Sequence, residues 1–277
     1  MRTRAFRQVD VFCSSRGMGN GLAVVHDADG LGDEDMQSFA HWTNLSETTF
    51  LLSPTSPGAD YRVRIFTPGG ELPFAGHPTL GTCHAWLEAG GAPAQSGVVI
   101  QECGVGLVPV QRGERLAFAA PPLLRDGPVD AATLDSVLRC LALDGGDVID
   151  AQWVDNGPGW VAVLLRDADA VLRVKPAAIE GKIGVVGLHP SGSGAAIEVR
   201  AFFEVDGVTR EDPVTGSLNA SVAQWLLGSG RVTAPYVATQ GGALGRAGEV
   251  HVAQDADGTI WVGGAATTYI TGTVDLP

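Results

Sequence analysis

Two short helical segments constrain the fold of this chain more than any other feature. Each is apolar nearly all round and carries a tryptophan near its end; the segments span Thr79–Glu88 and Ser217–Leu227. A helix without a polar face must be covered on every side, so each segment requires an enclosing layer of other elements. Both follow a glycine-containing turn and end at further glycines. This pattern predicts an internal duplication, and its alternative is two unrelated helices with similar flanks.

The rest of the chain favours strands. The 38 Gly and 16 Pro residues separate many short runs rich in Val, Ile, Phe and Thr, which is typical of an α+β protein dominated by strands. Further helical periodicity is confined to Asp33–Trp42 and Ala132–Leu143. We therefore expect two halves, each a sheet curled around one central helix. The stretch from Leu123 to Asp130 is the expected linker between them.

The charge of the chain excludes some classes of partner. Eighteen basic and 31 acidic residues give a formal charge of −13. Such a field repels nucleic acid and anionic lipid surfaces, so we expect neither as a partner. If the substrate is itself an anion, local hydrogen-bond donors must override the global charge.

No segment predicts a membrane span or a secretory signal. The longest apolar run, Trp160–Leu165, is far shorter than the ~20 residues that cross a bilayer. The first twelve residues alternate polar and apolar side chains, which predicts a strand rather than a signal peptide. We therefore expect a soluble, cytoplasmic protein. The four cysteines show no CxxC pair or zinc-ligand spacing and are expected to be buried thiols: Cys13, Cys83, Cys103 and Cys140.

Chemically distinctive residues gather in three segments: NLSETTF at 44–50, FTPGGELPFAGHPTLGT at 66–82 and EDPVTGSLNA at 211–220. The second and third directly precede the two buried helices. A helix amino terminus offers unpaired N–H donors and a partial positive charge, which bind carboxylate or phosphate. Gly76 and Gly216 would let a ligand approach the backbone closely. We expect both helix starts to face one cleft between the halves, where a small anionic substrate binds.

Local chemistry leaves the roles of the three titratable residues in these segments open. Glu47 precedes an apolar, β-branched run, where burial would raise its pKa and suit it to accept and return a proton. Asn44 and Glu47 also have the spacing of a helix capping box. His77 is either a proton donor or a structural residue at a helix start. Asp212, before Pro213, is either a catalytic carboxylate or a cap of the following helix.

Together, the three segments resemble the phenazine-biosynthesis isomerase-like family, whose patterns are N-L-S-E-T-x-F, E-L-P-F-A-G-H-P-T-L-G and E-D-P-A-T-G-S. The resemblance extends to VDVF at 9–12, GNGLAVV at 19–25 and QGGALGRAG at 240–248. It implies the fold of diaminopimelate epimerase and proline racemase, with two pseudo-symmetric β-barrel-like halves, each wrapped around a central helix. The expected halves are residues 1–122 joined by 267–277, and residues 123–266, with the site between them.

The resemblance also implies an isomerase that needs no metal or organic cofactor. In the resembled enzymes the Glu of the S-E-T segment shuttles a proton on one face of the substrate and shifts a double bond, and Glu47 matches it. His77 and Asp212 would hold and polarise the substrate, and family relatives are often homodimers. The substrate-binding residues implied by the same motifs are Asn20, Ser46, Gly76, Gly216 and Ser217.

Three other functions remain open at this stage. A lyase or dehydratase acting on a small amino acid would use the same proton abstraction, and so would an epimerase. Epimerase-type relatives use two cysteines, whose places Ala75 and Asp212 take here, so a two-thiol epimerisation is not expected. The third alternative is a ligand-binding homologue without catalysis.

Overall fold

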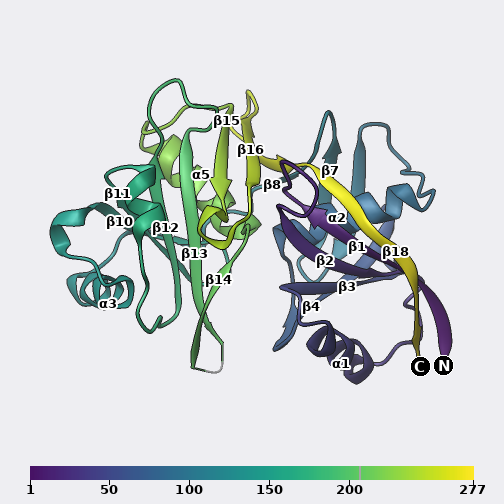
Figure 1. Ribbon diagram of the computed structural model, residues 1–277. Helices are drawn as coiled ribbons and strands as arrows, with labels where there is room; N and C mark the ends of the chain where they lie inside the picture. Colours follow the sequence, from purple (N-terminus) through teal and green to yellow (C-terminus); the bar gives the residue numbers. More distant parts are fainter. Residues whose placement is uncertain (206) are drawn as a thin grey trace. The chain divides into compact units, whose positions relative to one another are not determined.

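The computed structural model describes residues 1–205 and 207–277 of the chain, which divides into two compact units. The first unit comprises Met1–Ala119 and Gly263–Pro277, and the second comprises Ala120–Val262. The last strand, β18 (Ala266–Leu276), pairs antiparallel with β1 (Arg2–Val11). The two ends of the chain therefore lie side by side in the first unit (Figure 1).

The strands of the first unit alternate antiparallel hairpins with two parallel crossovers. Strand β2 is antiparallel to β1 and parallel to β3, while β4 is antiparallel to β3 and β5 but parallel to β6. Strands β6, β7 and β8 follow as an antiparallel meander. The bounds are β2 (Asn20–Val25), α1 (Asp33–Thr43), β3 (Glu47–Leu52), β4 (Tyr61–Thr67), β5 (Gly70–Leu72), α2 (Gly76–Glu88), β6 (Val98–Cys103), β7 (Gly106–Arg112) and β8 (Leu116–Ala119).

The second unit repeats this order after a short strand and a helix. Strand β11 is antiparallel to β10 and parallel to β12, and β13 is antiparallel to β12 and β14 but parallel to β15. The bounds are β9 (Arg125–Pro128), α3 (Ala131–Leu141), β10 (Val148–Asp155), β11 (Trp160–Leu165), α4 (Ala168–Arg173), β12 (Lys182–Leu188), β13 (Ile197–Val205), β14 (Val208–Asp212), α5 (Gly216–Gly228), β15 (Tyr236–Gln240), β16 (Gly248–Gln254) and β17 (Ile260–Gly264).

Equivalent side-chain contacts accompany this repeated order of elements. In the first unit Arg64 forms a two-pronged ion pair with Glu71 across β4 and β5. In the second unit Arg200 does the same with Glu211 across β13 and β14. Such agreement in strand direction, crossover and contact indicates two copies of one structural unit, as expected for an internal duplication.

The two apolar helices occupy equivalent places in the repeats. Helix α2 packs against β1, β2, β3 and the β6–β8 meander, and α5 packs against β10 and β16. Gly81 of α2 lies so close to β2 that a Cβ atom there would stand 2.6 Å from Cδ2 of Leu22. In the second unit, Leu218 of α5 approaches Gly184 of β12 in the same way. Glycine on one partner therefore permits close packing of helix and strand in both units.

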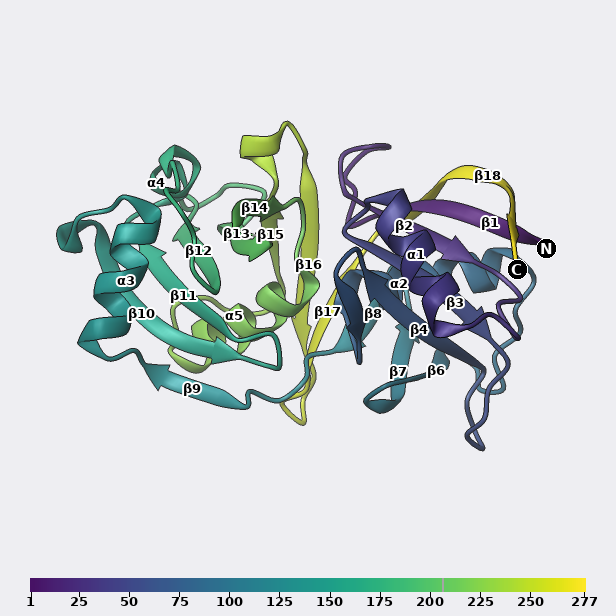
Figure 2. The same cartoon turned by 90° about the horizontal axis from the view of Figure 1, so that it is seen from below.

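The remaining helices, α1, α3 and α4, cover the faces of the strands opposite those that α2 and α5 contact. Helix α1 contributes Met36 and Ala40 to a core with Phe50 and Phe66. Helix α3 lies beside β10 and β11 (Figure 2). Helices α3 and α4 contribute Val137, Leu141 and Val171 to a core with the odd-numbered residues of β11. Because both faces of β11 are covered, its whole sequence, WVAVLL, is buried.

Several sequence-based expectations can be compared with these elements. The fold is mixed α/β, with many strands and few helices; the barrel-like form of the halves stays a prediction. Helix α4 and the short strands β5, β9 and β14 were not predicted, because segments of three to six residues are too short to show a period. The four cysteines are unpaired, and all but the half-buried Cys103 are buried. In the part of the chain that the structure describes, no helix has the length and apolar character of a membrane span.

Candidate active site

Glu47 is the first residue of β3, at the end of the sheet where its parallel neighbour β2 also begins. The next four residues are buried, whereas the Glu47 side chain retains 14% of its exposure. Asn44 ends α1 in the left-handed conformation, with φ of 53°, and its N–H donates to the Ala40 carbonyl. The chain thus passes from a helix end into a strand. The capping-box interpretation of Asn44 and Glu47 is therefore wrong.

His77, the second residue of α2, contacts Glu47. Its side chain is only 4% exposed, and its Nε2 lies 3.3 Å from Oε2 of Glu47. Burial lowers the pKa of His77 to about 3, so the imidazole is neutral at pH 7 and the contact is not an ion pair. A neutral imidazole has one N–H and one lone pair. Glu47 therefore faces a neutral side chain rather than a buried imidazolium.

The start of α2 lies beside this pair and offers donors for an anion. The residue before the helix, Ala75, makes no side-chain cap, and the first turn holds no acidic residue. Gly76, the first helical residue, is buried. Helix starts of this kind present N–H groups and a partial positive charge. An anionic substrate would be attracted here in spite of the overall negative charge of the chain.

Asn20 and Ser46 lie at the same end of the sheet as Glu47. Asn20 is the buried first residue of β2, and Ser46 directly precedes Glu47. The buried carboxylate of Asp10 accepts hydrogen bonds from the N–H groups of Gly17 and Gly19, at 2.6 and 3.0 Å. This carboxylate fixes the turn that leads into Asn20. The first unit therefore contains five of the predicted residues, at this end of the sheet and at the start of α2.

Asp212 is the last residue of β14 in the second unit. Its Oδ2 accepts a hydrogen bond of 2.6 Å from the Thr215 hydroxyl. Thr215, rather than Asp212, is the N-cap residue of α5, which then begins at Gly216. The Ser217 hydroxyl accepts a hydrogen bond of 3.0 Å from Nε1 of Trp160. The second unit thus also places a carboxylate just ahead of a buried helix, but here a threonine stands between them.

The strand registers of the two repeats define which positions are equivalent, and they show how the repeats diverged. The equivalent pairs are Glu47 and Lys182, His77 and Ser217, Leu72 and Asp212, and Ala75 and Thr215. The Glu–His pair thus has its counterpart in lysine and serine, and the Asp212 carboxylate has its counterpart in leucine. Within the chain, Ala75 matches Thr215. Neither position carries a cysteine.

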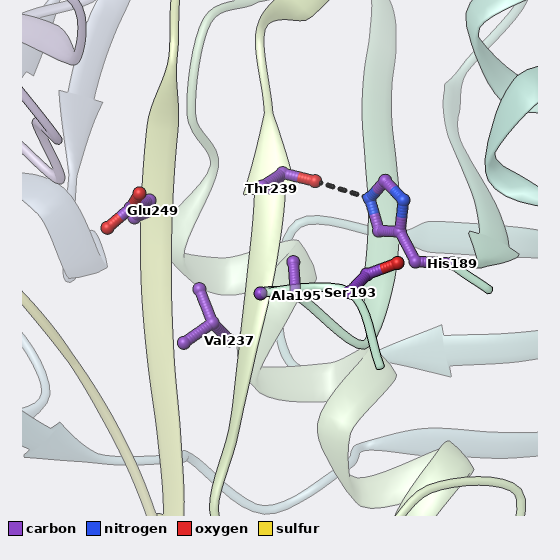
Figure 3. Close-up of a pocket in the computed structure, with 7 residues that line it drawn as sticks. His189, Ser193, Ala195, Val237, Thr239 and Glu249 are labelled. Carbon is purple, nitrogen blue, oxygen red and sulfur yellow. Dashed lines mark hydrogen bonds between the residues drawn. The ribbon is translucent and has the colours of Figure 1, made fainter. Parts of the chain in front are cut away.

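A pocket of about 330 Å³ lies elsewhere in the second unit, against β15 (Figure 3). Its lining residues are His189, Ser193, Gly194, Ala195, Val237, Thr239 and Glu249. Nε2 of His189 lies 2.8 Å from the Thr239 hydroxyl and 3.5 Å from Oε2 of the buried Glu198. Burial raises the pKa of Glu198 to about 7. This titratable cluster was not predicted from the sequence, and none of the predicted site residues is among those lining the pocket.

Comparison with known proteins extends the motif resemblance to the whole chain. The PhzC-PhzF family model, described as phenazine biosynthesis-like protein, matches residues 9–272. Antisense-enhancing sequence 1 of Schizosaccharomyces pombe is 35% identical, and the match covers 98% of this chain and 99% of that protein. A trans-2,3-dihydro-3-hydroxyanthranilate isomerase of Pseudomonas fluorescens is 33% identical, with 86% of each chain covered.

A solved structure agrees with these relationships. The phenazine biosynthesis protein of the PhzF family from Bacillus anthracis superposes with a TM-score of 0.83 at 25% identity, and 99% of each chain is covered. The family match, the whole-length relatives and the shared fold lead to one conclusion. This chain belongs to the PhzC-PhzF family of phenazine biosynthesis-like proteins.

Proposed function

We propose that this protein is an isomerase that moves a proton, and with it a double bond, within a small unsaturated carboxylate. The contact between Glu47 and the neutral His77 at the start of α2 carries the proposal, because it combines a proton acceptor with donors for an anion. The isomerase names of several relatives support the same reaction class. Secondary-metabolite biosynthesis is the proposed setting.

In the proposed reaction, the Glu47 carboxylate removes a proton from a carbon of the substrate. The electron pair of the broken C–H bond delocalises over the unsaturated system, and Glu47 becomes a carboxylic acid. Glu47 then returns the proton to a different carbon, which completes the double-bond shift and restores the carboxylate. Neutral His77 contacts Oε2 of Glu47, at 3.3 Å, and adds no charge beside it. A positioned acid/base group of this kind contributes roughly 10²–10⁴-fold to the rate.

The other predicted residues bind and polarise the substrate in this proposal. Asp212 holds a donor group of the substrate, because a carboxylate is an acceptor. The N–H groups at the starts of the two buried helices bind its carboxylate. The binding residues are Asn20, Ser46, Gly76, Gly216 and Ser217. Because Glu47 supplies the proton transfer, no metal or organic cofactor is required.

Incubation in deuterated water tests the reaction class. The probe is trans-2,3-dihydro-3-hydroxyanthranilate, named for the relatives' reaction, with smaller unsaturated carboxylates as further probes. Deuterium at a new carbon of a shifted isomer supports the proposal. Loss of water from the probe indicates a lyase, and deuterium at the original carbon with inversion indicates an epimerase. Tight binding without any exchange indicates a ligand-binding homologue.

Glu47→Gln tests the assigned residue. The amide keeps the shape of the side chain but cannot shuttle a proton, so we expect kcat to fall at least ~10²-fold. The matched control is Glu198→Gln, which makes the same change at the buried carboxyl of the other titratable cluster and should retain turnover. Wild-type turnover in Glu47→Gln would refute the assignment, and loss of turnover in Glu198→Gln alone would move the active site to the His189 pocket.

Two further expectations accompany the proposed reaction. Dialysis of the enzyme against a chelator should leave its activity unchanged, and activity restored only by added metal would contradict the cofactor-independent mechanism. The family resemblance also leads us to propose a homodimer, which light scattering after gel filtration would detect as twice the 28.6 kDa chain mass.

A further inference from the structure

Gln240 begins the QGGALGRAG segment, to which the proposed reaction gives no role. It is the buried last residue of β15. Its Oε1 accepts a hydrogen bond of 3.0 Å from the backbone N–H of Thr215, and its Nε2 donates at 3.1 Å to the backbone carbonyl of Asp212. A backbone N–H can only donate and a carbonyl can only accept. These two partners therefore fix the orientation of the Gln240 amide.

The fixed amide in turn fixes the direction of the Thr215 hydroxyl. Nε2 of Gln240 also donates to Oγ1 of Thr215, at 3.0 Å. Oγ1 of Thr215 lies 2.6 Å from Oδ2 of Asp212, and its single proton is directed there. Asn219 closes the network, because its Nδ2 donates to Oε1 of Gln240 and to the Thr215 carbonyl. A directed chain of donors thus runs from Gln240 through Thr215 to the Asp212 carboxylate.

The glycines of the same segment allow it to reach the Asp212 turn. Gly241 has φ of +94°, and a Cβ atom there would lie 2.7 Å from the Pro213 carbonyl oxygen. A Cβ atom on Gly248 would lie 2.3 Å from Cγ2 of Val214. Larger residues would push the ends of β15 and β16 away from residues 213–214. Both glycines therefore serve the contact that Gln240 makes.

The first unit provides a built-in comparison. There Gln101 of β6, the strand that corresponds to β15, has a comparable contact, although its register matches Ala238 rather than Gln240. Its Nε2 donates to the Thr79 hydroxyl, at 2.9 Å. The Thr79 hydroxyl donates in turn to the carbonyl of Ala75, also at 2.9 Å, and so stabilises only the start of α2. Both repeats thus use a buried glutamine to anchor the central helix. Only the network in the second unit ends on a carboxylate.

We propose that Gln240 is a positioning residue that, through Thr215, holds the Asp212 carboxylate in one orientation as a hydrogen-bond acceptor for the substrate. This inference rests on the proposed function for the role of Asp212, but the orientation itself is a property of the second unit. It explains why the QGGALGRAG segment, which begins at Gln240, 28 residues after Asp212 along the chain, contacts the turn that follows Asp212.

Four variants test the proposed network. Thr215→Val keeps the shape of the side chain and removes the donor, and Gln240→Glu replaces the NH₂ donor by oxygen. We expect each to lower kcat about 10²-fold, the usual cost of a displaced catalytic constellation, with a change of less than about threefold in KM. Thr215→Ser restores the hydroxyl and should recover most of the loss. The control Thr209→Val makes the same change on β14, at a hydroxyl that donates to the Ala177 carbonyl and does not contact Asp212, and should retain kcat.

Crystal structures of the same variants separate a failure of this inference from a failure of the proposed reaction. A rotated Asp212 carboxylate in Thr215→Val, with the native orientation in Thr215→Ser and Thr209→Val, supports positioning whether or not the probe turns over. An unmoved carboxylate in Thr215→Val overturns it. If wild-type enzyme is inactive on every probe while the carboxylate rotates as expected, the proposed reaction fails and the positioning holds.

Discussion

The pairing of Glu47 with His77 depends on burial as much as on proximity. In water, a carboxylate beside an imidazole would favour the imidazolium, but burial lowers the pKa of His77 to about 3. The residue therefore stays neutral over the whole physiological range. It can therefore contact Glu47 without holding it as an ion-paired carboxylate, which would weaken the capacity of Glu47 to take up a proton from carbon.

Glu198 shows the opposite effect of burial on an acid and gives a test at the residue scale. Its pKa is raised from 4.5 to about 7 by burial, and the groups facing it are His189, Thr239, Arg200 and Glu211. A raised pKa means that the folded state holds the proton more tightly than the unfolded state. The resulting stabilisation is complete below pH 4.5 and is lost as the pH rises through 7.

We therefore expect the free energy of unfolding of Glu198→Gln, minus that of the wild type, to be larger at pH 8 than at pH 5. Urea unfolding of both proteins at the two pH values measures this difference. The variant stays uncharged, so its free energy of unfolding should fall less on going to the higher pH. An equal difference between the two proteins at both values would contradict this account of Glu198.

At the scale of elements, both central helices begin on glycine and lie against a strand at close range. This arrangement makes α2 unable to accept a larger residue on the side that faces β2. Gly81→Ala would bring a Cβ atom 2.6 Å from Leu22 and 2.7 Å from Val11. Overpacking a buried site costs about 1–3 kcal/mol, which exceeds the ~1 kcal/mol by which alanine favours a helix over glycine.

We predict that Gly81→Ala lowers the free energy of unfolding, as measured by denaturant titration. Gly228→Ala is the matched control, because Gly228 ends α5 and an added Cβ would meet no atom within 4 Å. That variant should be neutral or slightly more stable. Stabilisation by Gly81→Ala would show that α2 can shift away from β2.

At the scale of the whole molecule, the duplication provides two versions of each contact in different surroundings. The Arg200–Glu211 pair is buried, with Arg200 only 5% exposed, and Arg200 also donates to the carbonyls at the end of α4. In the Arg64–Glu71 pair, the glutamate is 41% exposed. Removing one partner of a buried ion pair leaves an unpaired buried charge, whereas a surface pair is screened by water.

Glu211→Gln should therefore lower the free energy of unfolding by about 3–5 kcal/mol, and Glu71→Gln by ~1 kcal/mol or less. Parallel urea titrations of the two variants make the comparison. Equal losses would mean that the two pairs are solvated alike. The experiment uses one repeat as the control for the other.

Much of this organisation was predicted from the sequence, though unevenly. The helices at 79–88 and 217–227 were predicted because their composition leaves no polar face, and the structure extends them to Gly76–Glu88 and Gly216–Gly228. Strand β14 was missed because its sequence, VTRED, is polar and short. Asp212 was singled out through its motif. Its partner Gln240 was not, since it lies 28 residues away in the chain, and the role of Thr215 depends on the direction of its hydroxyl, which the sequence does not give.

By itself, the sequence determined the class of elements, the positions of the two enclosed helices and the membership of the family, because these depend on local composition and on contiguous motifs. Only the tertiary structure decided between capping and strand for Glu47 and brought His77 to 3.3 Å from it. It alone fixed the donors that orient Asp212. These features depend on burial and on hydrogen-bond direction between segments distant in the chain, and neither quantity is encoded in any single stretch of residues.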